Sequence, residues 1–270
     1  MEEGNKVDSG YSLSYENISL TYFIPGENPE DINGDHCHDR YEISYLLSAS
    51  GRYIVEGCEH KLSQGILLLI KPAAFHRVEL DIGELEGYTV HFNKKALTPA
   101  VQAMLDRLCD GECGGVAFTP TLISDAVTTA HDRFATATVL SDNEAREYVQ
   151  AVLSEIIILL SAASGEQMKG TDEELGARVA KYLNANIERS ISLERLARRF
   201  FVSKFHLCRA FKSYAGTSVH AYVNQKRIIH AKRLIESGMT ASRAAERVGF
   251  GDYSSFYRAY VRVVGKSPTA

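Results

Sequence analysis

The stretch SKFHLCRAFK, at residues 203–212, decides the fold of the C-terminal part of the chain because it has a second copy. Residues 252–261 read DYSSFYRAYV, so the Arg-Ala-aromatic triplet of the first stretch recurs 49 residues later, and a Gly-x-Ser triplet follows it each time. An Ala- and Arg-rich amphipathic segment precedes each copy, at residues 193–200 and 241–248. Each copy therefore predicts a helix, a tight turn and a second helix, a unit that can place its second helix in the major groove of DNA.

The spacing of apolar residues predicts that this whole part is helical. Helices are expected at residues 172–187, 193–200, 204–214, 219–237, 241–248 and 253–264. Short polar side chains that can accept a hydrogen bond from free backbone N–H groups precede all but the first of them: Ser192, Ser203, Ser218, Thr240 and Asp252. Gly238 follows the longest helix, where a residue with a left-handed backbone commonly ends a helix.

The second helix of each unit is expected to have a buried face and an exposed face. The residues predicted to face the core are Leu207, Ala210, Phe211 and Tyr214 in the first copy, and Phe256, Ala259, Tyr260 and Val263 in the second. Arg209 and Arg258 fall at equivalent outward positions, and an Arg side chain can donate two hydrogen bonds to guanine N7 and O6. The alternative is that either Arg neutralises a phosphate or forms an internal ion pair.

The charge of the chain is divided unevenly between its two parts. Residues 171–270 carry 18 Lys and Arg against 8 Asp and Glu, whereas residues 1–170 carry 12 against 26. This asymmetry favours a module that binds a polyanion, joined to a module with another role. A solvated basic surface is common on helices, but on a tandem helix-turn-helix it indicates DNA binding, because phosphate contacts supply most of the non-specific affinity.

The last hundred residues resemble the DNA-binding domain of the AraC/XylS family of bacterial transcription regulators. Besides the two quoted copies, the residues that carry the resemblance are Leu196-Ala197, Gly216-Thr217-Ser218, Tyr222, Arg227, Ala231, Leu234, Ala245, Val248-Gly249-Phe250 and Gly265-Lys266-Ser267-Pro268. The family implies two helix-turn-helix subdomains joined by a long helix, whose recognition helices enter successive major-groove segments of double-stranded DNA. By position, the DNA-binding residues would be Lys204, Phe205, Cys208, Arg209, Lys212, Tyr253, Ser254, Ser255 and Arg258. Cys208 departs from the polar residue that is more usual at its position.

The N-terminal part is expected to begin as β structure and to end in helices. Short β-rich runs at residues 41–47, 52–55, 65–70 and 88–92 lie within a region, 11–92, that is interrupted by Gly, Ser, Pro and Asp, as in an antiparallel sandwich or barrel. Helical spacing follows at residues 97–108, 122–135 and 142–161. We therefore predict an α+β chain of two domains: a cupin-like antiparallel β-barrel with trailing helices at 1–162, a linker at 163–171, and an all-helical domain at 172–270.

Residues 36–42, HCHDRYE, and the later His76 form the most chemically suggestive pattern of the N-terminal part. The set His36, His38, Glu42 and His76 resembles the ligands of metal-binding cupin barrels, in which imidazoles and a carboxylate can hold a transition metal. The resemblance to the cupin-like sensor domains of AraC/XylS regulators, over about residues 22–92, instead implies a small-molecule effector and no metal cofactor. The candidate effector-binding residues are His36, His38, Arg40, Tyr41, Glu42 and His76.

These observations predict a ligand-responsive, sequence-specific transcription regulator that is not an enzyme. The alternative is a metal-dependent cupin enzyme fused to a nucleic-acid-binding module, with His36, His38, Glu42 and His76 as metal ligands. The regulator would form a homodimer through helices in residues 97–162, and an activator would also contact RNA polymerase. The apolar stripe expected to make the dimer contact is Val149, Val152, Leu153, Ile156, Ile157 and Leu160.

The remaining composition favours the cytoplasm. No apolar run approaches the length of a membrane-spanning helix, and the acidic N-terminus lacks the basic start and apolar core of a signal peptide. The cysteines are odd in number and scattered, so we expect them to be thiols: Cys37, Cys58, Cys109, Cys113 and Cys208.

Overall fold

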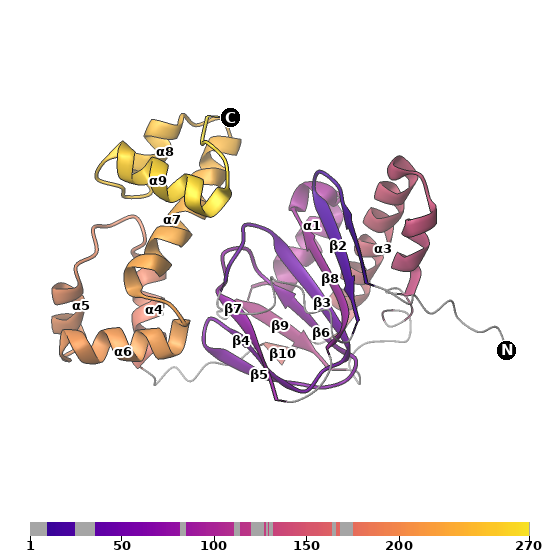
Figure 1. Ribbon diagram of the computed structural model, residues 1–270, viewed down its shortest axis with the longest axis horizontal. Coiled ribbons are helices and arrows are strands. Elements are labelled where there is room, and N and C mark those ends of the chain that lie inside the picture. Colours follow the sequence, from indigo (N-terminus) through magenta and orange to yellow (C-terminus); the bar gives the residue numbers. More distant parts are fainter. Residues whose placement is uncertain are drawn as a thin grey trace. The chain divides into compact units, whose positions relative to one another are not determined.

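The computed structural model describes residues 10–24, 36–81, 85–110, 114–119, 127, 129, 132–163, 166–167 and 175–269. The chain divides into two compact units, Met1–His36 with Arg40–Lys169 and Cys37–Asp39 with Gly170–Ala270. Figure 1 shows that the first unit consists largely of strands. In the second unit, every helix or strand among the described residues is a helix. Among the described residues, no helix combines the length and the apolarity needed to cross a membrane.

Two antiparallel sheets form the first unit. The larger sheet has the strand order β1 (Tyr11–Ser14), β2 (Ile18–Phe23), β8 (Glu86–Phe92), β3 (Tyr41–Ser48), β6 (Ile66–Ile70), β9 (Gly115–Phe118) and β10 (Glu166–Gln167). The smaller sheet consists of β5 (Cys58–Leu62), β4 (Gly51–Val55) and β7 (His76–Leu80). The predicted strands are confirmed. However, β9 lies between two of the predicted helices and β10 lies in the predicted linker. Neither strand was predicted, because both are too short to show a period of two.

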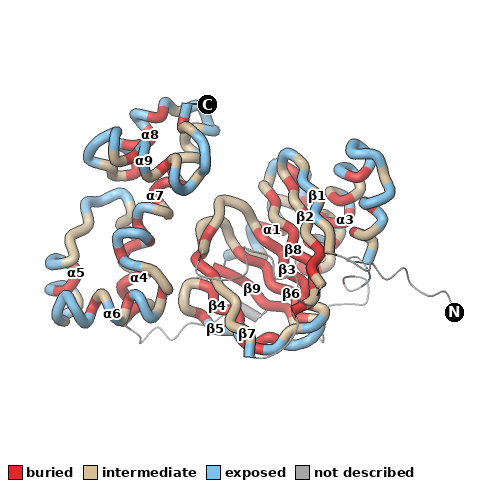
Figure 2. The backbone as a smooth tube through the Cα atoms, viewed as in Figure 1, coloured by how far each residue is buried: buried red, intermediate tan, exposed pale blue. Residues whose placement is uncertain are grey.

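The central strands of the larger sheet are buried on both faces. All five residues of β6 are buried, as Figure 2 shows for the middle of the sheet. Leu67 and Leu69 pack into a core under the helices, whereas Ile66, Leu68 and Ile70 pack into a second core shared with the smaller sheet. This alternation is the period of two that a strand imposes on its side chains. It places the second core between the two sheets.

Helices cover the outer face of the larger sheet. They are η1 (Lys94–Ala96), α1 (Pro99–Leu108), η2 (Arg133–Val139) and α3 (Asp142–Ala162). The predicted helix at 122–135 falls mostly outside the described residues. The predicted use of the α3 apolar stripe in a dimer is wrong for the side chains named, because Val149, Leu153, Ile157 and Leu160 are all fully buried in the core of their own domain. An amphipathic stripe identifies a buried face but not the surface that buries it.

The second unit contains the predicted helices with nearly the predicted ends. They are α4 (Leu175–Ala185), α5 (Leu193–Arg199), α6 (Lys204–Ala215), α7 (Val219–Glu236), α8 (Ala241–Arg247) and α9 (Tyr253–Val264). Each predicted N-cap accepts a hydrogen bond from a backbone N–H three residues later: Ser192, Ser203, Ser218, Thr240 and Asp252. Gly238 follows α7 with φ +98°, as a helix-ending glycine should.

Each helix-turn-helix has its own small core. Phe211 of α6 packs edge-on against Tyr222 of α7, and both are fully buried. In the second copy, Phe256 and Tyr260 of α9 pack against α7 and α8 residues such as Ile228 and Ala244. The prediction that Val263 faces this core is wrong: its side chain is 38% exposed, because it lies in the last turn of α9, beyond the contact with the neighbouring helices.

Arg227 of α7 connects the loop after α4 to the second helix-turn-helix. Its Nε donates to the Ile187 carbonyl at 2.8 Å and its Nη2 to the Arg189 carbonyl at 2.6 Å. The guanidinium carbon also lies 5.8 Å from the centre of the Phe250 ring. Only 8% of Arg227 is exposed, so these two carbonyl oxygens replace water around a buried charge.

The cysteines differ from the prediction at one position. Cys37, Cys109 and Cys208 are free thiols, but Cys58 is disulfide-bonded, and Cys113 lies outside the described residues. An odd and scattered set of cysteines does not reveal which sulfur atoms the fold brings together. Burial raises the pKa of Cys109 to about 11, which makes that thiol unreactive.

Two glycines with similar backbones provide a test of the packing at Arg227. Gly249 (φ +90°) and Gly238 (φ +98°) both have left-handed backbones, but a Cβ on Gly249 would lie 2.2 Å from the Glu188 carbonyl oxygen, whereas one on Gly238 would meet nothing within 4 Å. Gly238→Ala is therefore expected to cost only the left-handed strain of about 1–2 kcal/mol.

Gly249→Ala should destabilise the helical domain by clearly more, because the loop that Arg227 holds must also move. Differential scanning calorimetry of the whole chain measures both variants. Equal shifts of the helical domain's transition would show that the close approach to Glu188 has no energetic weight.

Candidate functional site

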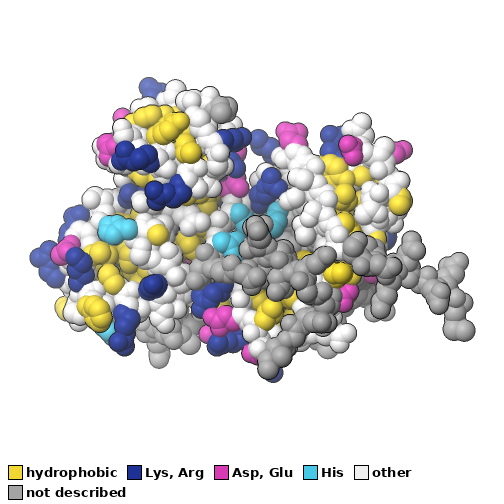
Figure 3. All heavy atoms as spheres, in the orientation of Figure 1, with side chains coloured by type: hydrophobic (Ala, Val, Ile, Leu, Met, Phe, Trp, Pro, Cys, Tyr) yellow, Lys and Arg dark blue, Asp and Glu magenta, His cyan; other side chains and the backbone are white. Residues whose placement is uncertain are grey.

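The recognition helices α6 and α9 present most of the predicted DNA-binding residues to solvent. Lys204, Phe205, Arg209 and Lys212 are exposed on α6, and Tyr253, Ser254 and Arg258 are exposed on α9, while Cys208 and Ser255 are half-buried. Neither Arg209 nor Arg258 points into the core of its subdomain. Figure 3 shows Lys and Arg side chains spread over the visible face of the helical unit.

Two of these basic side chains, Lys204 and Arg258, already contact a neighbouring side chain in the structure. Lys204 Nζ lies 2.7 Å from Glu194 Oε1 of α5, and this partner lowers the pKa of Glu194 to about 2. Arg258 Nη2 donates to Ser255 Oγ at 3.3 Å, which orients the guanidinium along the exposed face of α9. A phosphate or base would therefore compete with Glu194 for Lys204, whereas it could contact Arg258 together with Ser255.

The structure adds candidates that the sequence reasoning missed. A pocket between α4 and α5 is lined by Arg189, Arg195 and Arg199. Phe201, in the turn between α5 and α6, is 94% exposed and has a left-handed backbone, with φ +55°. The run of arginines at 189–199 was visible in the sequence, but the pocket depends on how the loop after α4 folds back.

A cluster of polar residues lies between the two sheets of the first unit. We call it the inter-sheet cluster, and its members are His36, Glu42, Ser44, Tyr53, His76 and His91. Glu42 and Ser44 are on β3, where they pair across the sheet with His91 and Thr89 of β8. Glu42, Ser44 and His76 are buried although polar, so the fold must supply their partners.

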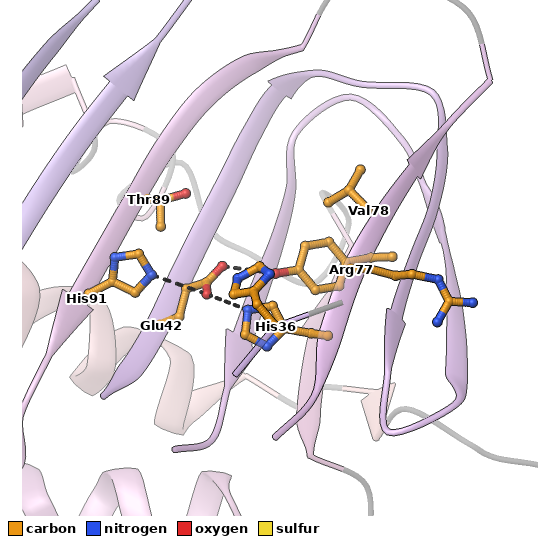
Figure 4. A pocket seen from close by; sticks show the side chains of 8 residues that line it. His36, Glu42, Arg77, Val78, Thr89 and His91 are labelled. Atoms are coloured by element: carbon orange, nitrogen blue, oxygen red, sulfur yellow. Dashed lines mark hydrogen bonds and ion pairs between the residues drawn. The ribbon is translucent and has the colours of Figure 1, made fainter. Parts of the chain in front are cut away.

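The Glu42 carboxylate divides its two oxygens between different partners. Its Oε1 accepts hydrogen bonds from Ser44 Oγ at 2.6 Å and Tyr53 Oη at 2.9 Å. Its Oε2 faces two imidazoles, His76 Nε2 at 3.1 Å and His91 Nε2 at 3.4 Å. Figure 4 shows the dashed line that joins Glu42 to His91. Burial, with Glu42 as a second cause, raises the pKa of Tyr53 well above its usual value, so the phenol remains a neutral donor.

His76 is oriented by its other ring nitrogen. Nδ1 lies 2.9 Å from the Ala74 carbonyl oxygen, which can only accept, so Nδ1 carries a hydrogen and Nε2 is directed at Glu42. His36 is paired with His76 through reciprocal backbone hydrogen bonds, and the two ring centres are 4.2 Å apart. Burial by itself lowers the pKa of His76, but the Glu42 carboxylate raises it, and the net shift is upward.

The candidate effector residues do not all meet in one place. The pocket between the sheets is lined by His36, Glu42, Tyr53, His76, Arg77, Val78, Thr89 and His91. His38, Arg40 and Tyr41 are not among them. Arg40 donates to Ser19 of β2, and Tyr41 stacks on Phe92 in the core under the helices. Tyr41 precedes Glu42 on β3, and consecutive strand residues point to opposite faces, so Tyr41 faces away from this pocket.

The size of the pocket limits what it can hold. Its volume is about 20 Å³, which is enough for one water molecule or one ion and too small for a sugar. Arg77 lines it only with its stem, because its guanidinium points away, as seen in Figure 4, toward Glu79 at 2.9 Å. Three candidate metal ligands of this unit, His36, Glu42 and His76, each offer one atom, and these atoms lie within 4.8 Å of one another.

Comparisons with known proteins assign both units. Residues 21–109 match the family model for an AraC-like ligand binding domain, and residues 196–270 match that for a helix-turn-helix domain; together they cover more than half of the chain. An uncharacterized HTH-type transcriptional regulator of Bacillus subtilis, YfiF, is 23% identical over 86% of this chain and 76% of its own length.

Two further comparisons cover nearly the whole chain. The HTH-type transcriptional activator RhaR of an Enterobacter species is 20% identical over 94% of this chain and 92% of its own length. Among solved structures, ToxT of Vibrio cholerae is 11% identical with a TM-score of 0.43, over 94% of this chain and 96% of its own.

The tandem helix-turn-helix and the ligand-binding domain define a DNA-binding transcription regulator rather than an enzyme. The chain belongs to the AraC family of transcription regulators. The comparisons give no support to the cupin-enzyme alternative.

Tyr53→Phe tests the inter-sheet cluster as a structural element. Removing the phenol hydroxyl leaves the buried Glu42 Oε1 with one donor fewer, so we expect a loss of about 1–3 kcal/mol of stability in the sheet domain. Calorimetry should detect it as a lower transition temperature. Tyr257→Phe is the control. This tyrosine is 42% exposed, so removing its hydroxyl should leave the stability almost unchanged. An unchanged transition in Tyr53→Phe would contradict the role assigned to its hydroxyl.

Proposed function

We propose that the regulator reads DNA through equivalent residues of α6 and α9. Arg209 and Arg258 are the central contacts, and the other candidates are Lys204, Phe205, Cys208, Lys212, Tyr253, Ser254 and Ser255. The observation that carries this proposal is the repeated geometry: each Arg lies on the exposed face of a recognition helix whose opposite face is buried in a separate core. Base contact by Arg gives sequence preference, whereas phosphate contact gives affinity without preference.

We further propose that the first unit controls DNA binding by taking up an effector. The inter-sheet cluster is the polar anchor for it, since His36, Glu42 and His76 line the pocket together. An effector that binds one arrangement of the regulator better than another shifts the population toward that arrangement, and this changes which DNA sites are occupied. Because it acts on DNA, we place the protein in the cytoplasm, and if it activates transcription, RNA polymerase is its partner there. We propose domain limits of 1–162 and 172–270 with a linker at 163–171.

Arg209→Ala should weaken binding to a specific site by about 1–3 kcal/mol, or roughly 5- to 150-fold, and should relax the base preference at one position. Specific sites are first selected from a random DNA library with the unmodified chain. Gel-shift titration then compares the selected site with random DNA at one fixed salt concentration. Arg258→Ala should show the same loss at a position in the adjacent groove.

Arg146→Ala is the matched control, because Arg146 is an exposed arginine of α3 in the other unit. It should leave both affinities unchanged. Equal losses on selected and random DNA would reduce Arg209 to a phosphate contact, and no loss on either would exclude α6 as the reading element.

We propose that the regulator is a homodimer that pairs through the outward face of α3. With the predicted stripe buried, this face still presents Ala151, Ile158 and Ala162, of which Ile158 is 44% exposed. These positions are spaced by seven and four residues and therefore lie on one side of the helix. A symmetric pair would bury the same face of both copies.

Ile158→Glu should shift a dimer toward monomer in sedimentation-velocity experiments, because it places a charge in an apolar contact. Val263→Glu, an equally exposed apolar position in the other unit, should not. A monomer at all concentrations in the unmodified chain, or a dimer that Ile158→Glu leaves intact, would contradict this interface.

A further inference from the structure

We infer that the inter-sheet cluster is a binding site for one divalent transition-metal ion, held by His36, Glu42 and His76. The inference rests on the proposed function, because it names the class of ligand that the effector-binding unit takes up. It rests on the composition of the cluster, the orientation of its donor atoms and the size of the pocket.

The donor set selects the class of ion. Two imidazoles and one carboxylate suit zinc, cobalt, nickel or iron, whereas magnesium and calcium prefer oxygen ligands alone. The three ligand atoms lie within 4.8 Å of one another. Two ligands on one tetrahedral zinc are about 3.3 Å apart, given metal–ligand distances of about 2.0 Å. The separation of 3.1 Å between His76 Nε2 and Glu42 Oε2 is already close to this value.

The groups around the ligands hold them in the orientation that a metal requires. The Ala74 carbonyl accepts from His76 Nδ1 and leaves Nε2 as the coordinating nitrogen. Ser44 and Tyr53 donate to Glu42 Oε1 and leave Oε2 directed at the imidazoles. Metal-binding proteins commonly fix their ligands by such contacts, and the contacts keep a carboxylate in its charged form at a buried position.

The pocket volume agrees with an ion rather than a metabolite. About 20 Å³ accommodates a single ion or water molecule among the lining residues. His36 is half-buried at the edge of the cluster, whereas Glu42 and His76 are buried within it. An ion could therefore reach the buried carboxylate from the side of His36.

The competing explanation is a proton. A protonated His76 paired with Glu42 would satisfy both atoms without any metal. The two explanations differ in stoichiometric metal uptake, which can be measured without reference to DNA.

The experiment titrates Co²⁺ into the full-length protein, purified without a histidine tag and stripped with a chelator that is then removed. We expect visible d–d absorption bands that saturate at one Co²⁺ per chain and disappear when Zn²⁺ displaces the cobalt. Glu42→Gln keeps the size of the side chain but removes its charge, and His36→Ala alters a half-buried residue that the fold should tolerate. Each should weaken cobalt binding at least 10-fold.

His220→Ala is the matched control, since His220 is an exposed histidine on α7 in the other unit, and it should bind cobalt as the unmodified chain does. Calorimetry of the metal-free variants verifies folding, and if Glu42→Gln does not fold, His36→Ala decides. Absence of saturable binding, or binding that survives in the folded variants, would overturn the inference in favour of the proton. Gel shifts with the metal-free protein test DNA binding separately, so a failed metal site leaves the proposed DNA contacts standing.

Discussion

The helical domain depends on one buried cation. Arg227 donates to the carbonyl oxygens of Ile187 and Arg189, and so fixes the loop after α4 to the long helix α7. The same guanidinium lies beside Phe250 and approaches Gly249, in the turn of the second helix-turn-helix. A residue on the connecting helix thus contacts elements of both subdomains. The spacing of the two recognition helices follows from how rigidly α7 and these contacts hold them.

The sheet domain solves a different problem, the burial of a charged network between two apolar layers. Alternation along β3 sends Ile43 and Tyr45 to the core under the helices and Glu42 and Ser44 to the space between the sheets. Buried carboxylates are costly unless hydrogen-bonded, and here hydroxyl groups and imidazoles surround both oxygens of Glu42. Burying these polar groups costs free energy, and apolar side chains in their place would stabilise the core more simply. The presence of the cluster therefore favours a role in ligand binding over a role in stability alone.

Much of the helical domain was predictable because its signals are local. Ser203 and Asp252 cap their helices by contacts within four residues, and the exposed positions of Arg209 and Arg258 follow from helical periodicity. The failures were non-local. The apolar stripe of α3 could have faced a second copy or its own sheet, and Tyr41 could not be separated from Glu42 without knowing which face of β3 looked toward the smaller sheet. His91 was missed because nothing in its neighbourhood in the sequence links it to Glu42.

The sequence by itself therefore determined the two-part organisation, the duplicated helix-turn-helix, the separation of charge and the family, since these depend on composition, repetition and short-range pattern. Only the tertiary structure decided that β8 pairs with β3, and this pairing is what brings His91 to Glu42. It also decided that the space there holds no more than an ion or a water molecule. The physical reason is that strand register and sheet packing are set by contacts between residues far apart in the chain, which leave no local trace.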